Sequence, residues 1–149
     1  ESLVAHNLSQ TVSTLTMIKD LEAAAKRQNK QASLPLKNDT GMGRVGIAPC
    51  DTLALSQSIA TSPHLSFEGI ATHIAWECAE DMHKAQEQIL RFSACLDQVK
   101  DIPIKWRHAA NSVITVHLPN SHFDLVRVGL LTYGIAPAQG AKHCPHTCH

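Results

Sequence analysis

The stretch FEGIATHI, residues 67–74, decides the fold. It is rich in apolar and β-branched residues, and such a run predicts a strand that is buried in a sheet. Residues 80–99 follow it with the clearest helical pattern of the chain, whose apolar stripe consists of Ala85, Ile89, Phe92, Leu96 and Val99. A buried strand followed by an amphipathic helix is the repeating unit of parallel sheets.

The same alternation extends in both directions from this unit. Upstream lie a short apolar run at residues 3–6, a helical pattern at 10–27, a second apolar run at 34–37, and a helix at 51–59 that Asp51 would cap. Downstream lie a strand candidate at 102–108, an ambiguous stretch at 112–118 and a last apolar run at 123–128. This order predicts an α/β fold, built from βα units around a parallel sheet in one domain.

Composition excludes several classes of function. The 149 residues carry no net charge and form no basic face, so we expect no nucleic-acid partner. We expect no membrane partner either, because no apolar run approaches the roughly 18 residues of a membrane span. The five cysteines are odd in number and mostly scattered, which favours a reducing, cytoplasmic location. The chain opens on Glu1 without a secretory signal, and we expect it to be part of a longer protein.

Polar side chains follow the ends of the predicted strands, where α/β folds place their chemistry. In chain order they are Lys37, Asp39, Arg44, Thr72, His73, His108, Asn111, Ser112, Arg127 and Gly129. Because the ends of parallel strands meet at one rim of the sheet, we expect these side chains to form one cationic pocket. Such a pocket suits an anionic, phosphorylated ligand.

The glycine-rich stretch KNDTGMGRVG, residues 37–46, could itself cradle a phosphate, since glycines let backbone N–H groups approach an anion. Its glycines at 41, 43 and 46 fit the spacing G-x-G-x-x-G. However, that motif should open a helix, and here Ile47, Ala48 and Pro49 follow instead. The spacing alone is therefore weak support for a phosphate loop.

Four segments, KNDTGMGRVG, FEGIATHIA, RHAANS and DLVRVGLLTYGI, resemble in this order the signature segments of alanine racemases. The resemblance runs from about residue 3 to residue 137 and implies an enzyme that binds pyridoxal 5'-phosphate in a (β/α)₈ barrel. Residues 3–137 would then form a partial barrel of this TIM type, with about five parallel strands and alternating helices. The implied function is interconversion of L- and D-alanine for the bacterial cell wall. Related racemases that act on serine share these segments.

The resemblance also implies roles for individual residues. Arg127 resembles the arginine that faces the pyridine nitrogen of the cofactor, where a guanidinium that stays protonated would leave the nitrogen unprotonated. Arg44 resembles the arginine that contacts the phenolic oxygen, and Lys37 the lysine that orients this arginine. That lysine is carbamylated in many members, and the sequence leaves its state in this chain open. The glycines would then compact the loop so that Arg44 turns back over the ring.

The remaining implied contacts concern the phosphate and the polar surroundings of the ring. The phosphate would be bound by the Ser112 hydroxyl and by backbone N–H groups at Gly129 and Leu130. His73 and His108 would be neutral supports that hydrogen-bond to polar neighbours, Arg127 among them, and Asn111 would join their network. Tyr133 is expected to pack rather than to react.

The family's two catalytic bases have no counterpart in this sequence. One is the Schiff-base lysine near the start of the barrel, and no V-x-K-A-x-A-Y-G-like motif occurs here. The other is a tyrosine that a partner subunit supplies, so a homodimer is expected for the full-length family. A complete barrel needs about 250 residues, so we expect this chain alone to be inactive. A non-catalytic remnant or cofactor-binding module is the alternative hypothesis.

The last residues, 138–149, do not resemble the family and are expected to form an unstructured tail. They contain zinc-type ligands at Cys144, His146, Cys148 and His149. Their spacing is too tight for the usual zinc geometry, and we expect no metal site.

Overall fold

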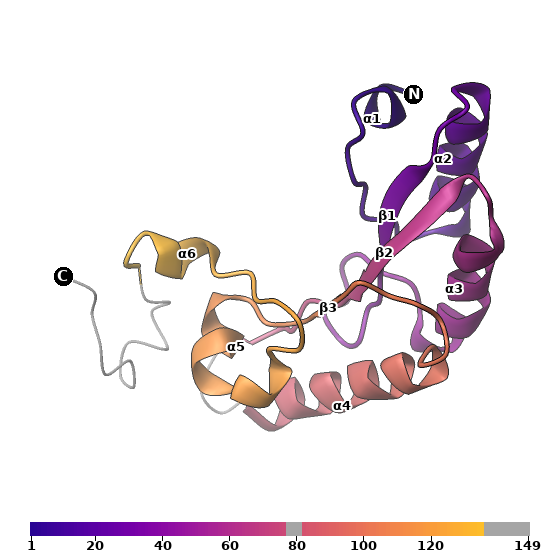
Figure 1. Ribbon diagram of the computed structural model, residues 1–149. Coiled ribbons are helices and arrows are strands. Elements are labelled where there is room, and N and C mark those ends of the chain that lie inside the picture. Colours follow the sequence, from indigo (N-terminus) through magenta and orange to yellow (C-terminus); the bar gives the residue numbers. More distant parts are fainter. Residues whose placement is uncertain (77–81, 136–149) are drawn as a thin grey trace.

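A computed structural model describes residues 1–76 and 82–135 of the chain (Figure 1). The helices are α1 (Ser2–Ala5), α2 (Leu15–Arg27), α3 (Thr52–Thr61), α4 (Met82–Gln98), α5 (Ser112–His117) and α6 (Gly129–Thr132), with short 3-10 turns η1 (Pro49–Asp51) and η3 (Pro119–Ser121). The strands are β1 (Ala32–Lys37), β2 (Leu65–Ala71) and β3 (Trp106–His108). The predicted tail at residues 138–149 lies outside the described residues.

The sheet is parallel throughout and has the order β1-β2-β3, which is also the order of the chain. One further segment joins each edge through a single parallel bridge: Val12 pairs with Leu36 of β1, and Arg127 pairs with Asn111 just after β3. Five segments therefore run side by side, although only three are regular strands. This arrangement confirms the predicted partial α/β barrel.

Helices α2, α3 and α4 follow the outer side of the strands, while among the described residues no helix covers their inner side (Figure 1). β1 shows how its sequence sets this polarity. Ala32, Leu34 and Leu36 are buried toward the helices, and the alternate residues are half-buried on the other face. Since side chains alternate along a strand, Lys37 ends β1 on the open face.

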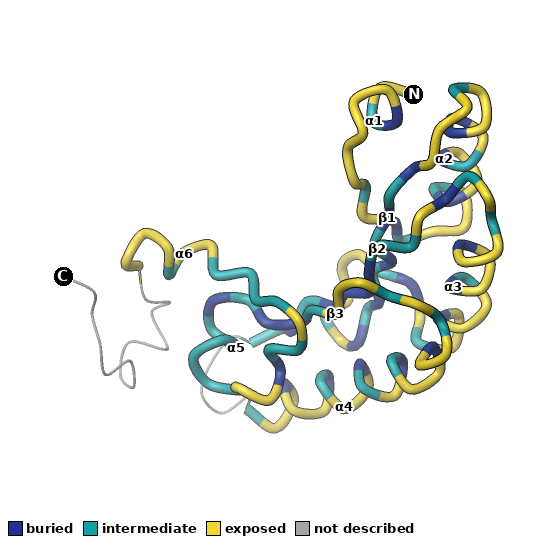
Figure 2. Tube along the Cα trace, in the orientation of Figure 1, coloured by how far each residue is buried: buried dark blue, intermediate teal, exposed yellow. Residues whose placement is uncertain are grey.

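Two apolar clusters connect the helices to the sheet, and both appear as dark blue segments in Figure 2. The first contains Ile18 and Leu21 of α2 with Leu34 and Leu36 of β1. Thr14 begins α2 by accepting a hydrogen bond from the Met17 amide over 3.2 Å, which satisfies one of the free N–H groups of the first turn. The second cluster packs α4 against the ends of β2 and β3. It contains Phe92, its largest buried side chain, together with Ile70, Ile74 and Ile114.

Several predicted boundaries differ from the observed ones. Residues 3–6 were expected as a short apolar run, but residues 3–5 belong to helix α1, which ends before His6. The segment that pairs with β1 contains Val12 instead. The strand predicted at 102–108 is short because Pro103 has no amide hydrogen to donate, and only Trp106–His108 pair with β2. Residues 123–128 form no strand beyond the bridge at Arg127. The ambiguous residues 112–118 form α5, which Asn111 caps.

No helix within residues 1–76 and 82–135 is long and apolar enough to cross a membrane.

Candidate functional site

The strand ends enclose a cavity of about 500 Å³ on the open face of the sheet. Predicted site residues from four different segments line it: Lys37, Arg44, His73, His108 and Arg127. Because β1, β2 and β3 are parallel, their C-terminal ends meet at this rim, and each delivers one or two of these side chains. The convergence of the cationic residues on one pocket is therefore a finding of the structure.

Arg127 occupies the centre of this rim because several backbone carbonyls hold it. Its Nη2 donates hydrogen bonds to the carbonyl oxygen of Thr72 over 3.0 Å and to that of Ala109 over 3.1 Å. Its own backbone amide donates to Ala110 over 2.9 Å. Burial lowers the pKa of Arg127, but a guanidinium remains protonated at any working pH. The side chain is thus a fixed positive charge at the edge of the cavity.

His108 accepts from this arginine, which confirms the predicted contact. Nη1 of Arg127 lies against Nδ1 of His108, and burial together with the nearby Arg127 lowers the pKa of His108 to about 4. Burial also lowers the pKa of His73, with further contributions from Arg127, Arg44 and Lys37. Both histidines are therefore neutral near pH 7, as expected beside cations.

Of the two histidines only His108 contacts Arg127, and His73 has a different polar neighbour. Its Nε2 instead faces Nδ2 of Asn111 at 3.4 Å, and the same Asn111 amide donates to the carbonyl of Ile74 over 3.1 Å. Asn111 belongs to the histidine network as predicted. It reaches His73 rather than Arg127 because the guanidinium is already engaged by the carbonyls of Thr72 and Ala109.

Ser112 begins α5 immediately beside this network. Asn111 caps the helix through a 3.1 Å bond from the Ile114 amide, so Ser112 stands in its first turn. The serine is 6% exposed, and its hydroxyl makes no hydrogen bond within the described parts of the chain. Contrary to the expectation of one common pocket, neither Ser112 nor Asn111 lines the cavity. Gly129 and Leu130 are exposed at the start of α6 and do not line the cavity.

The glycine-rich loop is organised by Asp39. Its carboxylate accepts backbone hydrogen bonds from Gly41, Gly43 and Arg44, each 3.0 Å long. Burial would raise the pKa of this carboxyl, but the backbone donors outweigh burial and lower it. Since an internal carboxylate already uses these N–H groups, the loop does not cradle a phosphate, and its function is to bring Arg44 to the cavity.

Lys37 shares the pocket with two other cations. Burial, then Arg44 and Arg127, lower the pKa of its amine, and Asp39 offsets only part of this effect. Like charges held close together disfavour the charged form, so the uncharged amine is more accessible here than on an ordinary surface lysine.

Two threonines connect these parts, of which the sequence placed Thr72 at the rim and gave no role to Thr40. Thr40 and Thr72 are both 1% exposed and share a 2.8 Å hydrogen bond between their hydroxyls. Thr72 lies directly before His73 at a strand end, and this position in the sequence could have indicated a role in the site. Tyr133 was expected to pack, but it is 81% exposed at the end of α6, which lies at the outer edge of the fold (Figure 1).

Comparison with known proteins identifies the relatives of this fold and rim. A family model described as "Alanine racemase, N-terminal domain" matches residues 1–137. The alanine racemase of Treponema pallidum is 38% identical over 145 residues, covering 91% of this chain and 38% of that protein. That of Desulfosudis oleivorans is 36% identical over 148 residues, covering 91% and 38%.

A solved structure agrees with these sequence matches. The crystal structure of alanine racemase from D-cycloserine-producing Streptomyces lavendulae superposes with a TM-score of 0.85 at 30% identity, covering 91% of this chain and 37% of that chain. The present chain thus spans a little over a third of the length of these relatives. With the match over residues 1–137, the chain belongs to the alanine racemase N-terminal domain family.

Proposed function

We propose that this chain supplies the pyridoxal-phosphate-binding rim of an alanine racemase. The single observation that carries the proposal is the convergence of Lys37, Arg44 and Arg127, with two neutral histidines, on one cavity of about 500 Å³. The cofactor is a small aromatic ring with a phosphate and a phenolic oxygen, all of which cationic and neutral donors can bind. The size, charge and donor types of the cavity fit this group.

Arg127 would contact the ring nitrogen of the cofactor. Its guanidinium donates but cannot accept, so the ring nitrogen would remain unprotonated. When bound, the cofactor supplies stabilisation of negative charge at the α-carbon of an amino acid. An unprotonated ring nitrogen weakens that stabilisation, which limits side reactions such as transamination. His108 would support this role by fixing one edge of the guanidinium.

Arg44 would contact the opposite side of the ring, and Lys37 would orient this arginine. The Asp39-centred loop holds the Arg44 backbone, so the side chain can reach the phenolic oxygen of the cofactor. Lys37 lies in the same cavity, and a carbamylated Lys37 would be an anion able to pair with Arg44. The lowered pKa of Lys37 supports this chemistry, because only an uncharged amine reacts with carbon dioxide.

Ser112 would bind the phosphate together with the backbone amides of Gly129 and Leu130. Ser112 is largely buried, and within the described residues its hydroxyl makes no hydrogen bond, which supports this assignment because the hydroxyl is available to an anion. Its place in the first turn of α5 adds a favourable helix terminus for an anion.

The activity of the whole enzyme requires parts that this sequence does not contain. Two bases on opposite faces of the substrate would move the α-proton, and neither the cofactor-linking lysine nor the catalytic tyrosine has a counterpart here. The substrate would be alanine, with serine as a further candidate, and the complete enzyme would be a homodimer. This chain, assayed alone with cofactor, is expected to racemise alanine no faster than free pyridoxal phosphate.

Calorimetric titration with pyridoxamine 5'-phosphate tests the binding proposal, because this cofactor form has no aldehyde that could react with surface lysines. We expect saturable binding with one site per chain. Arg127→Gln should weaken binding by at least about tenfold, the equivalent of about 1.4 kcal/mol. Arg27→Gln is the matched control, since this exposed arginine pairs with Glu1 far from the cavity. Equal affinities for both variants would contradict the proposal.

A non-catalytic cofactor-binding module remains the second candidate. Two results together would support it. The calorimetric titration would show that the chain binds the cofactor, and co-expression with an upstream barrel segment would fail to restore racemisation.

A further inference from the structure

Arg44 and Arg127 of the cavity depend on two different strand ends for their positions. The distance between the two cations therefore depends on how these strand ends are joined. Arg44 belongs to the loop that follows β1, whereas Arg127 is held by the carbonyl of Thr72, directly after β2. Mutual repulsion between such cations opposes their convergence. The sheet already joins the ends of β1 and β2, where the Asn38 amide donates to the Ala71 carbonyl over 2.8 Å, and a side-chain contact reinforces this joint.

The hydroxyl of Thr72 forms this contact. Thr72 Oγ1 donates to the carbonyl of Asn38 over 3.1 Å and lies 2.8 Å from Thr40 Oγ1. A hydroxyl has one hydrogen to donate. Since Thr72 uses its hydrogen for Asn38, Thr40 must be the donor in the hydroxyl pair. The chain of bonds thus has one direction, from Thr40 through Thr72 to Asn38.

Thr72 also receives bonds through its backbone from the other side of the site. Its amide donates to the carbonyl of His108 over 3.1 Å, and its carbonyl accepts from Arg127 over 3.0 Å. Every polar group of Thr72 is therefore engaged with a segment that carries a cavity residue.

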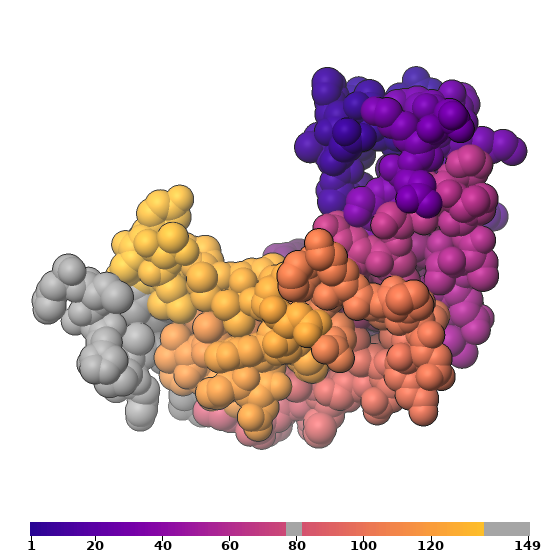
Figure 3. Space-filling view, viewed as in Figure 1, coloured from indigo at the N-terminus to yellow at the C-terminus, as the bar shows by residue number. Residues whose placement is uncertain are grey.

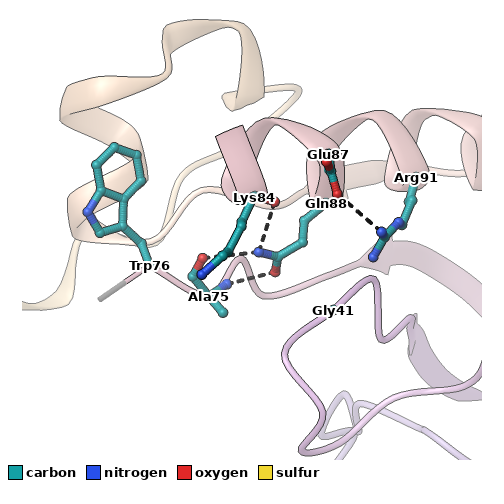
Figure 4. Close-up of a pocket in the computed structure, with 7 residues that line it drawn as sticks. All are labelled: Gly41, Ala75, Trp76, Lys84, Glu87, Gln88 and Arg91. Atoms are coloured by element: carbon teal, nitrogen blue, oxygen red, sulfur yellow. Dashed lines mark hydrogen bonds and ion pairs between the residues drawn. The ribbon is translucent and has the colours of Figure 1, made fainter. Parts of the chain in front are cut away.

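Helix α4 holds the Thr40 end of this chain from outside the sheet. Nη1 of Arg91 donates to the Thr40 carbonyl over 3.2 Å, and the Gln88 side chain bonds to both the amide and the carbonyl of Ala75. Figure 4 shows Arg91 extending from α4 toward the loop with Gly41, while Gln88 reaches Ala75 on the segment after β2. The helix thereby fixes both loops relative to each other.

We propose that Thr40 and Thr72 are positioning residues, whose hydroxyl pair sets the separation between Arg44 and Arg127 in the cavity. Thr72 lies in the wall of the cavity, but its hydroxyl is directed to the Asn38 carbonyl, while its backbone carbonyl holds Arg127. Thr40 acts through the Thr72 hydroxyl. The relevance for cofactor binding rests on the proposed function, but the positional effect can be measured without any cofactor.

The test uses the titration of His73 by NMR in the full chain. The charged groups that face this histidine are Arg127, Arg44 and Lys37. Thr72→Val keeps the shape of the side chain but removes the hydroxyl, and we expect the pKa of His73 to rise toward its ordinary value as the cations move apart. Thr72→Ser restores the hydroxyl and should restore the wild-type titration.

Thr52→Val is the matched control. Thr52 is a fully buried threonine that accepts a 2.6 Å bond from the Asn38 side chain, not from the Asn38 backbone that Thr72 uses. Within the described residues it has no hydrogen bond to residues 39–46 or to Arg127. This variant should lose stability without moving the His73 titration. If Thr72→Val and Thr52→Val both leave the titration unchanged, or if Thr72→Ser behaves like Thr72→Val, the proposal is wrong.

Thr40→Val keeps the test decisive if Thr72→Val does not fold, because the bond from Thr72 to Asn38 remains. It should shift the His73 titration in the same direction by a smaller amount, with Thr40→Ser near wild type, and an unchanged titration would overturn the proposal. In the calorimetric titration, Thr72→Val should bind pyridoxamine 5'-phosphate about tenfold more weakly. If the wild-type chain does not bind it at all, the proposed function fails while the His73 titration still decides the role of the threonines.

Discussion

Nη1 of Arg127 and Nδ1 of His108 lie 2.5 Å apart at the rim of the cavity. Because a guanidinium can only donate, Nδ1 must be the acceptor, and the histidine proton is assigned to Nε2. The contact joins the last residue of β3 to the edge segment that contains Arg127. The space-filling view shows these two parts as the orange and yellow portions beside a broad hollow (Figure 3).

This contact predicts that the protein loses stability in mild acid. The pKa of His108 is about 4 in the folded state and 6.5 when unperturbed, so the unfolded chain binds more protons between these values. The free energy of unfolding should therefore fall by about 2 kcal/mol between pH 6.5 and pH 4, after allowance for partial exposure. Urea unfolding at several pH values measures this slope.

His108→Asn should reduce that slope, because asparagine offers an acceptor oxygen that does not titrate in this range. His6→Asn serves as the control, since His6 is exposed at the end of α1. An unaltered slope in His108→Asn would show that other groups cause the acid sensitivity.

Asp39→Asn should loosen the loop that carries Arg44. The carboxylate accepts three backbone bonds, and bonds to a charged acceptor each contribute about 1.5–3 kcal/mol. Partial exposure reduces the sum, so we expect a loss of about 2 kcal/mol. Amide hydrogen exchange at Gly41 and Gly43 should become faster than in wild type, whereas Asp20→Asn on the exposed face of α2 should change neither quantity.

Protonation of Asp39, like that of His108, should lower the free energy of unfolding as the pH falls. Here the folded state loses a negative charge, whereas at His108 it gains a positive one. The folded pKa of Asp39 is lowered, so its contribution is present above the unfolded pKa of 3.8 and disappears as pH falls through the folded value. Slow exchange at Gly43 that persists below this range would contradict the role of the carboxylate.

Gly46→Ala should be among the most damaging substitutions in the loop. An added Cβ would lie 2.4 Å from the Asp39 nitrogen and 2.6 Å from the Asn38 carbonyl carbon, and the φ angle of +153° is unfavourable for alanine. We expect a loss above about 3 kcal/mol, compared with about 1 kcal/mol for Gly43→Ala, where φ is +68° but no atom lies within 4 Å. Gly129→Ala, which meets nothing within 4 Å, is the control. Equal losses for the two loop variants in urea unfolding would refute the steric argument.

Lys37 should form a carbamate in the presence of bicarbonate. Its amine has a lowered pKa. The carbamate forms when the uncharged amine nitrogen bonds to the carbon of carbon dioxide and one proton leaves the nitrogen to solvent. A ¹³C NMR signal from labelled bicarbonate should appear in wild type and in Lys19→Arg, but not in Lys37→Arg. A signal that survives in Lys37→Arg would place the modification elsewhere.

The sequence predicted the sheet and the rim because both depend on local pattern. The run at residues 67–74 is apolar enough to identify β2, and the polar residues after each strand converge because parallel strand ends must meet. The glycine motif was less informative. Its spacing suggested a phosphate loop, and only the coordinates show that the Asp39 carboxylate occupies the amides.

Long-range side-chain bonds were not predictable in this way. The bond between Thr40 and Thr72 joins residues 32 positions apart, and nothing in the periodicity of either segment specifies it. Asn38 is similar: it is a polar residue at the end of a strand, yet it is fully buried and donates to Thr52. Tyr133 looked like a packing residue by type, but its exposure depends on what surrounds α6.

A crystal structure of the chain with pyridoxamine 5'-phosphate is the most direct measurement of the central claim. The account predicts the ring nitrogen within hydrogen-bond distance of Arg127, the phenolic oxygen facing Arg44, and the phosphate at Ser112. A cofactor bound elsewhere, or bound in the cavity with its phosphate against Arg127, would contradict it.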